Sequence, residues 1–180
     1  MPTVTISRRG AERLRAGHPW IYRSDIARAD AEPGDLVRVA TERGRPVGWA
    51  FWSSTSQIAL RVIQGPQGPQ VPKVNEREMI DMRLTAAIAY RASLEIDATA
   101  WRVVNAEADC LPGLIVDRYD DCLVVQTLCQ GTDRRLALIT ELLAERCSSR
   151  QRLREMFVPL RHDPGRAQSF RARGGCSAPD

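Results

Sequence analysis

The sequence predicts an α+β protein: a small β-barrel, then a small α+β domain, then an irregular tail. Short aromatic or β-branched runs separated by Gly, Pro and Ser fill residues 1–72, as in a barrel of short strands. A helical apolar period followed by strand-like runs fills residues 73–146. Residues 147–180 have no sustained apolar period. We therefore expect two domains with these bounds and a basic tail that is disordered or translated out of frame.

The overall composition is that of a globular protein, with 43% hydrophobic and 27% charged residues. No apolar run reaches the roughly 18 residues that span a bilayer, and the first residues lack the apolar core of a signal peptide. We therefore expect a cytoplasmic protein without a membrane partner. The five cysteines contain no CxxC pair and the two histidines lie far apart, so no metal site is predicted.

The charge is unevenly distributed along the chain. Residues 1–74 carry 11 basic and 6 acidic side chains, residues 75–146 carry 8 and 13, and residues 147–180 carry 7 and 3. The chain is thus a basic module, an acidic module and a basic tail. A basic module is the electrostatic footprint of a phosphate-binding surface.

The first domain begins with a short helix and continues as strands. Residues 11–16 have helical spacing, and Pro19 ends this segment because proline lacks an amide donor. Residues 35–41, 46–53 and 57–63 read as strands separated by turn-forming residues. Closing such strands into a barrel removes exposed sheet edges.

The Gly- and Pro-rich residues 64–73 mark a boundary, and a helix follows them. Asn75, with Glu78 three positions later, resembles a capping box. Apolar residues then recur at helical spacing: Ile80, Leu84, Ala87 and Ile88.

Three strands follow that helix, at residues 101–105, 114–119 and 122–128. Pro112-Gly113 suits a type II turn between the first two, because proline sets the first φ and glycine accepts the positive second one. Asp120-Asp121 joins the last two in a hairpin.

A second helix is expected after these strands. Thr132 can cap it, because threonine accepts a hydrogen bond from a free amide at a helix start. The helix carries three apolar residues on one side: Leu136, Ile139 and Leu143.

Candidate catalytic groups are few. Glu107 and Asp109 could act as an acid and a base, but both also suit a tight turn and have no histidine near them in sequence, so we predict a structural role. Cys110, Cys122 and Cys129 have mostly acidic or apolar neighbours, so we predict no nucleophilic thiolate among them. The sequence also shows no glycine-rich nucleotide-binding turn, so we expect no cofactor in this chain.

The basic and aromatic residues of the first domain favour RNA binding. Aromatic rings can stack on unpaired bases while arginines contact phosphates. Trp49 and Phe51 have strand spacing onto one face, and we expect the aromatics of residues 49–52, including Trp52, in the barrel core rather than on this surface. His18 fits either a base contact or packing at the barrel edge. The predicted RNA-binding residues are Arg9, Arg13, Arg15, His18, Trp20, Arg23 and Arg61.

Four runs of the sequence resemble one family: RLRAGHPWIYRSDI, PGDLVRV, GRPVGWAFWSSTSQIALRVI and RVVNAEADCLPGLIVDRY. They are similar to the N-terminal and central portions of the RlmI-like S-adenosylmethionine-dependent methyltransferases, over about residues 6 to 146. The resemblance implies a PUA domain, which is a small RNA-binding pseudo-barrel, followed by a central α+β domain. Members of that family end in a Rossmann-type domain and methylate C5 of a cytosine in large-subunit ribosomal RNA.

The resemblance implies RNA, from the large ribosomal subunit, as the partner, and S-adenosylmethionine as the cofactor of the full-length family. Ala108, Cys110 and Asp120 stand where the family commonly has glycine, so each has a Cβ that a positive φ would penalise. The family's glycine-rich cofactor motif and catalytic cysteine lie downstream of the matching region. No catalytic or cofactor residue is therefore carried over to this chain.

Three functions are compatible with these observations. The leading interpretation is a truncated rRNA methyltransferase that keeps RNA binding and is inactive alone. The alternatives are a stand-alone RNA-binding adaptor and an accessory subunit whose acidic domain docks a separate catalytic chain.

Overall fold

The computed structural model describes residues 1–67 and 75–146, together with the backbone of residues 152–156 and 170–172. These residues cluster into two compact units. The first unit contains residues 1–67 and 129–134, and the second contains residues 75–128 and those from 135 onward. The predicted α+β class is confirmed. The functional division at residue 72 stays a prediction.

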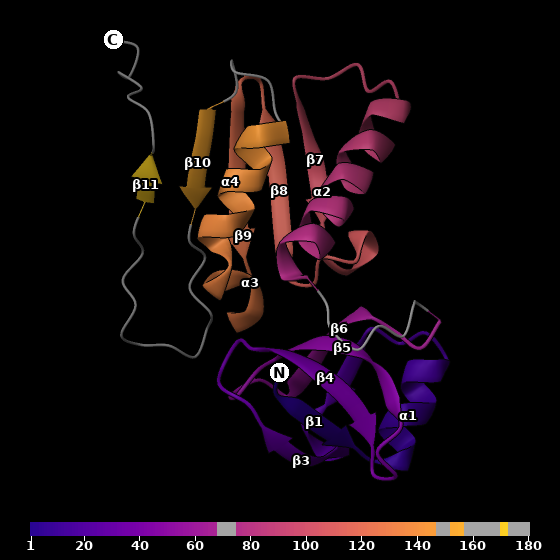
Figure 1. Cartoon of the computed structure of the whole chain (residues 1–180). Coiled ribbons are helices and arrows are strands. Elements are labelled where there is room, and N and C mark those ends of the chain that lie inside the picture. The colour runs from indigo at the N-terminus through magenta and orange to yellow at the C-terminus, as the bar shows by residue number, and fades with distance from the viewer. Residues whose placement is uncertain (68–74, 147–151, 157–169, 173–180) are drawn as a thin grey trace. The chain divides into compact units, whose positions relative to one another are not determined.

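The first unit is a mixed six-stranded sheet that forms a half-barrel (Figure 1). The strand order is β2-β6-β5-β4-β1-β3, and all neighbours are antiparallel except β1 and β4. No ladder joins β2 to β3 among the described residues, so the predicted barrel is only partly closed. The elements are β1 (Thr3–Ile6), α1 (Arg8–Arg15), β2 (Trp20–Tyr22), the 3-10 turn η1 (Arg23–Asp25), β3 (Ile26–Asp30), β4 (Leu36–Thr41), β5 (Pro46–Trp52), β6 (Ile58–Gln64) and α3 (Gln130–Arg134).

The three strands predicted for this unit are confirmed as β4, β5 and β6. The other three strands were not predicted. β1 and β2 have only four and three residues, and β3 is largely exposed, so none of them contains a long apolar alternation. Their pairing depends on neighbouring strands, which local sequence does not reveal.

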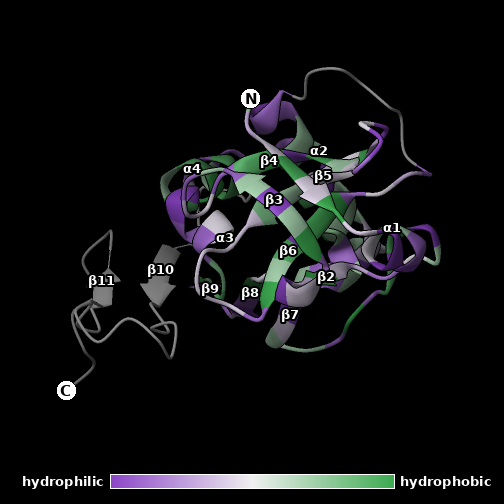
Figure 2. Cartoon of the chain, turned by 90° about the horizontal axis from the view of Figure 1, so that it is seen from below, coloured by the Kyte–Doolittle hydropathy of each residue, from purple (hydrophilic) through white to green (hydrophobic). Residues whose placement is uncertain are grey.

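Strand β5 is buried on both faces, which makes it the centre of this unit. Every residue from Val47 to Trp52 is buried, and Figure 2 shows β4, β5 and β6 as mostly hydrophobic ribbons. Trp49, Phe51 and Trp52 are 3%, 3% and 6% exposed, so the prediction that they are core residues is confirmed. One face of the sheet covers a single apolar cluster made of Val4, Ile6, Ala11, Leu14, Ile21, Val37, Val39, Val47, Ala50, Trp52, Ala59 and Leu60.

The short helix α3 covers Phe51 on the other face of β5. A Cβ added at Gly131 would lie 2.3 Å from Cγ of Phe51, so only glycine permits this close approach. Ser54 donates its amide to Oε1 of Gln130 at 3.0 Å, and Arg134 pairs with Asp35 at 2.7 Å. These contacts place residues 129–134 in the first unit, although in sequence they lie between β9 and β10 of the second.

The predicted cap at Thr132 is wrong. Thr132 lies inside α3, and its hydroxyl donates to the carbonyl of Cys129 at 3.1 Å. The helix bearing Leu136, Ile139 and Leu143 is the separate α4 (Leu136–Arg146), which begins after a break at Arg135. The sequence pattern joined two helices because both are short and adjacent.

The second unit is a sheet with the strand order β11-β10-β9-β8-β7. Helices α2 and α4 pack beside each other on this sheet (Figure 1). Arg77 of α2 pairs with Glu141 at 3.0 Å and with Glu145 at 2.8 Å, both on α4. The elements are α2 (Glu76–Ser93), β7 (Ala100–Asn105), the 3-10 turn η2 (Ala106–Asp109), β8 (Leu114–Tyr119), β9 (Cys122–Thr127), α4, β10 (Arg152–Met156) and β11 (Phe170–Ala172).

Local signals in this unit are confirmed. The Asn75 side chain accepts the amide of Glu78 at 3.3 Å, so it caps α2 as predicted. Gly113 has a φ of 70°, the positive value that the predicted turn requires. Strands β8 and β9 pair from Leu114 with Thr127 to Tyr119 with Cys122, which is the predicted hairpin.

Most of the predicted irregular tail, residues 147–151, 157–169 and 173–180, lies outside the described residues. The rest of it forms strands: β10 pairs parallel to β9, and β11 pairs antiparallel to β10. Such pairing satisfies the free N–H and C=O groups at the edge of β9. The described part of the tail therefore extends the sheet.

The contact of Gly131 with Phe51 generates a stability prediction. The Gly131→Ala variant adds a methyl group that would overlap the side chain of Phe51. We therefore expect the free energy of unfolding to fall by about 1–3 kcal/mol. Urea denaturation measures this change. In the control Gly65→Ala, the new Cβ lies no closer than 3.5 Å to a flexible glutamine side chain, and we expect a change below about 0.5 kcal/mol. Equal stability of the two variants would contradict the close approach.

Candidate nucleic-acid interface

Helix α1 presents the arginines of the predicted surface. Ser7 caps the helix by accepting the amide of Gly10 at 3.2 Å. Gly10, Ala11 and Leu14 are buried and define the face that packs on the sheet. The arginines of α1 occupy the other positions, so their side chains lie toward the surface.

A buried carboxylate lies beneath this helix. Asp25 is 0% exposed, and its Oδ1 accepts from Nε of Arg9 at 2.6 Å and from the Ser7 hydroxyl at 3.3 Å. Its Oδ2 lies 3.3 Å from a terminal guanidinium nitrogen of Arg13. Arg9 and Arg13 therefore neutralise an internal charge, and their side chains are still 61% and 38% exposed.

Two aromatic rings, those of Trp20 and Tyr22, lie close to the ring of His18. His18 lies 6.0 Å from Trp20 and 6.2 Å from Tyr22, between ring centroids. We call His18, Trp20 and Tyr22 the aromatic strip. His18 Nδ1 also contacts the backbone nitrogen and oxygen of Trp20, at 3.2 and 3.1 Å, which holds its ring in place.

Two arginines flank the aromatic strip. The guanidinium of Arg13 lies over Tyr22, 5.0 Å from the ring centroid, and that of Arg61 lies 5.9 Å from the ring centroid of Trp20. Strand pairing causes the second contact, because Trp20 of β2 is opposite Arg61 of β6. The structure thus brings together four of the predicted residues: Arg13, His18, Trp20 and Arg61.

The other predicted residues lie elsewhere in the first unit. Arg23 donates to the carbonyls of Ser53 and Ser56 and lies over the Trp52 ring at 4.8 Å, so it ties η1 to the loop after β5. Arg15, at the end of α1, is exposed and lines a separate depression together with Arg8. Contact of any of these residues with RNA stays a prediction.

In the acidic turn of the second unit, Asp109 forms an ion pair that is mostly buried. Both carboxylate oxygens of Asp109 accept from Arg91, at 2.6 and 2.8 Å, and the side chains of Arg91 and Asp109 are 12% and 11% exposed. The Asp109 carboxylate also accepts the amide of Asn105 at 2.6 Å. It therefore closes η2 and anchors α2 to the turn.

Two of the three positions expected to strain the backbone do so. Cys110 and Asp120 have φ values of 55° and 51°. Ala108 does not have a positive φ, whereas Ala106 does, at 46°. Each left-handed residue with a Cβ costs roughly 1 kcal/mol.

The three described cysteines lie in different environments. Cys129 is buried and its sulfur contacts the hydroxyl of Thr132 at 3.3 Å, while Cys122 contacts the Asp121 carboxylate at 3.4 Å. Cys110 is exposed in the turn after η2. Cys147 and Cys176 lie outside the described residues.

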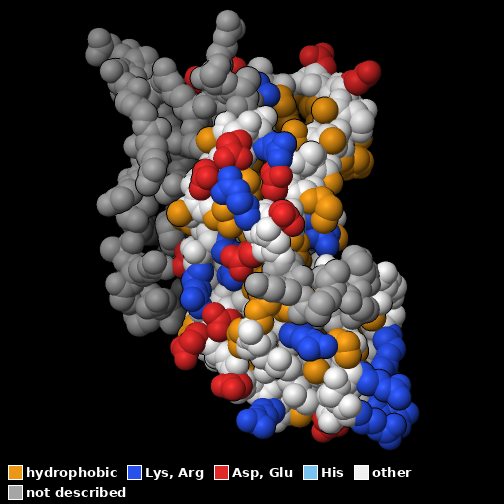
Figure 3. Space-filling model, in the orientation of Figure 1, with side chains coloured by type: hydrophobic (Ala, Val, Ile, Leu, Met, Phe, Trp, Pro, Cys, Tyr) orange, Lys and Arg blue, Asp and Glu red, His pale blue; other side chains and the backbone are white. Residues whose placement is uncertain are grey.

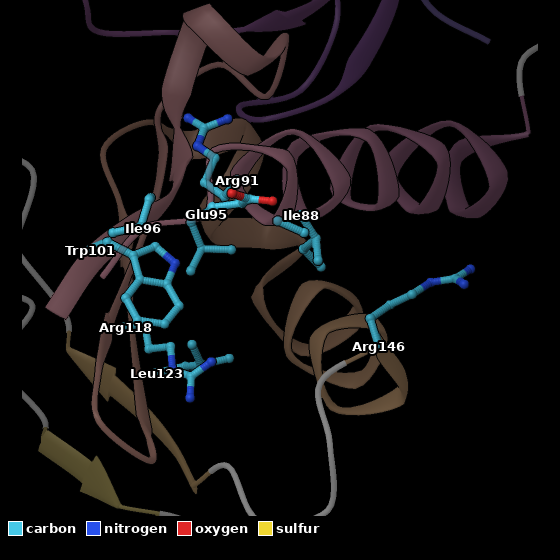
Figure 4. A pocket seen from close by; sticks show the side chains of 10 residues that line it. Ile88, Arg91, Glu95, Ile96, Trp101, Arg118, Leu123 and Arg146 are labelled. Carbon is cyan, nitrogen blue, oxygen red and sulfur yellow. The ribbon is translucent and has the colours of Figure 1, made fainter. Parts of the chain in front are cut away.

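The second unit contains a cavity of about 380 Å³ that the sequence did not indicate (Figure 4). Ile88, Ile96, Trp101 and Leu123 form its apolar wall. Arg118 lies over the Trp101 ring at 4.4 Å, because the two residues are opposite each other in β8 and β7. The other arginines of its lining pair with carboxylates, Arg91 with Asp109 and Arg146 with Asp81.

Among the described residues, no three His, Cys, Asp or Glu side chains gather as possible metal ligands. No helix within residues 1–67 or 75–146 is both long enough and apolar enough to cross a membrane.

Comparison with known proteins gives two kinds of similarity. Residues 4–64 match the PUA-like domain family. The chain is also 35% identical over 132 residues to ribosomal RNA large subunit methyltransferase I of Shewanella amazonensis, covering 71% of this chain and 32% of that protein. The protein of the same name from Erwinia tasmaniensis is 34% identical over 158 residues, with 82% and 37% covered. The chain therefore spans about a third of the length of the curated relatives it matches.

Solved structures show the same fold. A structure described as a SAM-dependent methyltransferase from Streptococcus mutans has a TM-score of 0.77 and 15% identity, covering 99% of this chain and 44% of that one. A second methyltransferase structure, in complex with SAH, has a TM-score of 0.74 and 14% identity, with 91% and 44% covered. The chain thus has a PUA-like domain and is a partial-length match to rRNA methyltransferases.

The buried carboxylate generates the prediction for this surface. Asp25→Asn removes the negative charge that pairs with Arg9 and Arg13, and we expect the free energy of unfolding to fall by about 2 kcal/mol. The loss is moderate because both arginines are partly hydrated and so are not left as buried, unpaired charges. Thermal unfolding of the variant measures the loss. Asp30→Asn is the control, because Asp30 is exposed at the end of β3. A loss of the same size in the control would remove the special role of Asp25.

Proposed function

We propose that this chain, a partial-length relative of the ribosomal RNA large subunit methyltransferase I proteins, binds ribosomal RNA through its PUA-like unit. One observation carries the proposal: His18, Trp20 and Tyr22 lie in one strip flanked by Arg13 and Arg61. The names of the relatives support ribosomal RNA, of the large subunit, as the partner. We propose that this binding takes place in the cytoplasm.

The chemistry of the strip suits unpaired bases. Trp20 and His18 have ring faces on which a base can stack, and stacking is worth about 1–3 kcal/mol per base. Arg13 and Arg61 lie beside these rings and can contact the phosphates of the stacked nucleotides. Arg9 donates to Asp25, and Arg23 donates to the carbonyls of Ser53 and Ser56. We propose that both arginines also contact RNA with their remaining donors.

We propose that residues 73–146 act as a scaffold between this RNA-binding unit and a methyltransferase domain of the kind found in the relatives. The Arg91–Asp109 pair, which anchors α2 to η2, and the bridges between α2 and α4 support this scaffold role, because they connect the elements of the second unit. In this proposal, residues 1–180 alone bind RNA without transferring methyl groups. A stand-alone adaptor and an accessory subunit would use the same RNA-binding surface.

Replacement of Trp20 tests the proposed surface. Trp20→Leu keeps an apolar side chain and removes the stacking ring, so we expect the Kd for a fragment of large-subunit rRNA to rise by about tenfold or more. Fluorescence anisotropy measures it. Trp101→Leu is the matched control, because that ring also carries an arginine but lies in the second unit, and its Kd should stay within about twofold of the wild type. If both variants bind as the wild type does, the strip is not the RNA-binding site.

Cofactor titration tests the second part of the proposal. Isothermal titration of the 180-residue chain with S-adenosylmethionine should give no saturable heat, while the same preparation binds rRNA. Stoichiometric binding of S-adenosylmethionine would show that this chain has a cofactor site of its own, and would overturn the proposal that it is inactive alone.

A further inference from the structure

A second basic surface lies at the side of α1 away from the proposed aromatic strip. Arg8, Arg15, Arg43 and Arg45 line a depression of about 340 Å³, together with Ala11, Thr41 and Glu42. We call it the arginine depression. Figure 3 shows basic side chains gathered at the lower right of the molecule, where Figure 1 places α1.

The sheet topology brings these residues together from distant parts of the chain. β1 runs parallel to β4, and Ile6 at the end of β1 lies opposite Thr41 at the end of β4. The start of α1 therefore lies beside the turn between β4 and β5. Arg8 and Arg15 come from the helix, and Arg43 and Arg45 come from this turn.

The turn holds its arginines in a defined place. Thr41 donates its amide to the carbonyl of Arg45 at 2.9 Å and accepts the amide of Arg45 on its hydroxyl at 3.2 Å. Gly44 donates to the carbonyl of Thr41 at 2.8 Å. An ordered turn loses less entropy on binding a ligand than a mobile one does.

The arginines of the depression differ from those near the aromatic strip in their partners. Arg9 and Arg13 pair with Asp25, and Arg23 donates to backbone carbonyls. Within the described part of the chain, the guanidinium groups of Arg15, Arg43 and Arg45 have no ion-pair partner, and Arg8 has only the exposed Glu12 at 2.8 Å. The hydrogen bond to Glu12 raises the pKa of Arg8 above its usual value, so the guanidinium group stays charged. The depression therefore has cationic donors available for an anion.

The shape and lining of the depression point to a chain of phosphates rather than a base or a single ion. No aromatic residue lines it, so it has no stacking surface. Arg8 and Arg15 are seven residues apart on one helix, roughly 10 Å along its axis, which exceeds the size of one phosphate group. Arginine binds phosphate oxygens through two parallel hydrogen bonds, which suits a polyanionic backbone.

We propose that the arginine depression binds the phosphodiester backbone of the RNA, separately from the aromatic strip that stacks its bases. The proposal rests on the proposed RNA-binding function and deepens it, because it adds Arg8, Arg43 and Arg45 to the contact surface. Phosphate contacts position a nucleic acid, and base contacts give sequence preference. In this proposal the depression adds phosphate contacts to those of Arg13 and Arg61, while the rings of the aromatic strip stack the bases.

The test compares two double variants of the full chain that remove the same charge. Arg43→Gln/Arg45→Gln removes two donors of the depression, and Arg28→Gln/Arg38→Gln removes two arginines of β3 and β4 that do not line it. The probe is an oligouridylate of about 16 nucleotides, which stacks weakly and so reports mainly phosphate contacts. Its Kd is measured over a series of salt concentrations.

The depression variant should bind the probe on the order of tenfold more weakly, and the slope of log K against log salt should fall by about 1.4, which is 0.7 for each lost phosphate contact. The control double variant should keep the slope of the wild type. Equal slopes for the wild type and the depression variant would overturn the proposal.

Other outcomes separate this proposal from the proposed function. If Trp20→Leu weakens rRNA binding while Arg43→Gln/Arg45→Gln does not, the RNA-binding function stands and the arginine depression is refuted. If the wild-type chain binds no RNA, both proposals fail. If the depression variant loses binding only to phosphatidylglycerol vesicles, the depression serves an anionic membrane surface and the proposal is overturned.

Discussion

The buried carboxylate of Asp25 is the interaction on which the first unit depends most. Its side chain joins the cap of α1 at Ser7 to Arg9 and Arg13 of the same helix, and its backbone carbonyl accepts the Ser7 amide at 2.8 Å. A carboxylate removed from water is costly unless charged donors surround it, so this arrangement tolerates few alternatives. It sets the position of α1 on the sheet. Both candidate surfaces, the aromatic strip and the arginine depression, take one of their sides from this helix.

The same interaction changes the meaning of an arginine-rich segment. Arg8, Arg9, Arg13 and Arg15 are equivalent in sequence, as four cations on one short helix. In the structure two of them neutralise Asp25, one has a neighbouring glutamate, and one has no ion-pair partner among the described residues. Basic charge on a surface steers an anionic ligand from a distance, whereas only donors that lack an internal partner can bind it fully. The net charge of the segment therefore overstates the number of arginines available to an anionic ligand.

Close packing of glycine explains how the chain is divided between its two units. Gly131 lets α3 approach Phe51 on the outer face of β5, so six residues that lie between β9 and β10 in sequence join the first unit. Within the second unit, the Arg91–Asp109 pair anchors α2 to the turn before β8.

The sequence by itself determined the local elements and their chemistry: strands β4 to β9 apart from their ends, the Asn75 cap, the Gly113 turn, the Asp120 hairpin and the burial of Trp49, Phe51 and Trp52. These features depend on neighbours in the chain, on side-chain period and on turn geometry, all of which are visible in one dimension. Tertiary structure alone decided the short strands β1 to β3, the break between α3 and α4, and the partners of each arginine. It also placed Arg43 and Arg45 beside Arg8 through the parallel pairing of β1 with β4. The physical reason is that strand pairing, buried ion pairs and glycine contacts join residues that are far apart in sequence. Local sequence propensities do not predict which of these distant residues will pair.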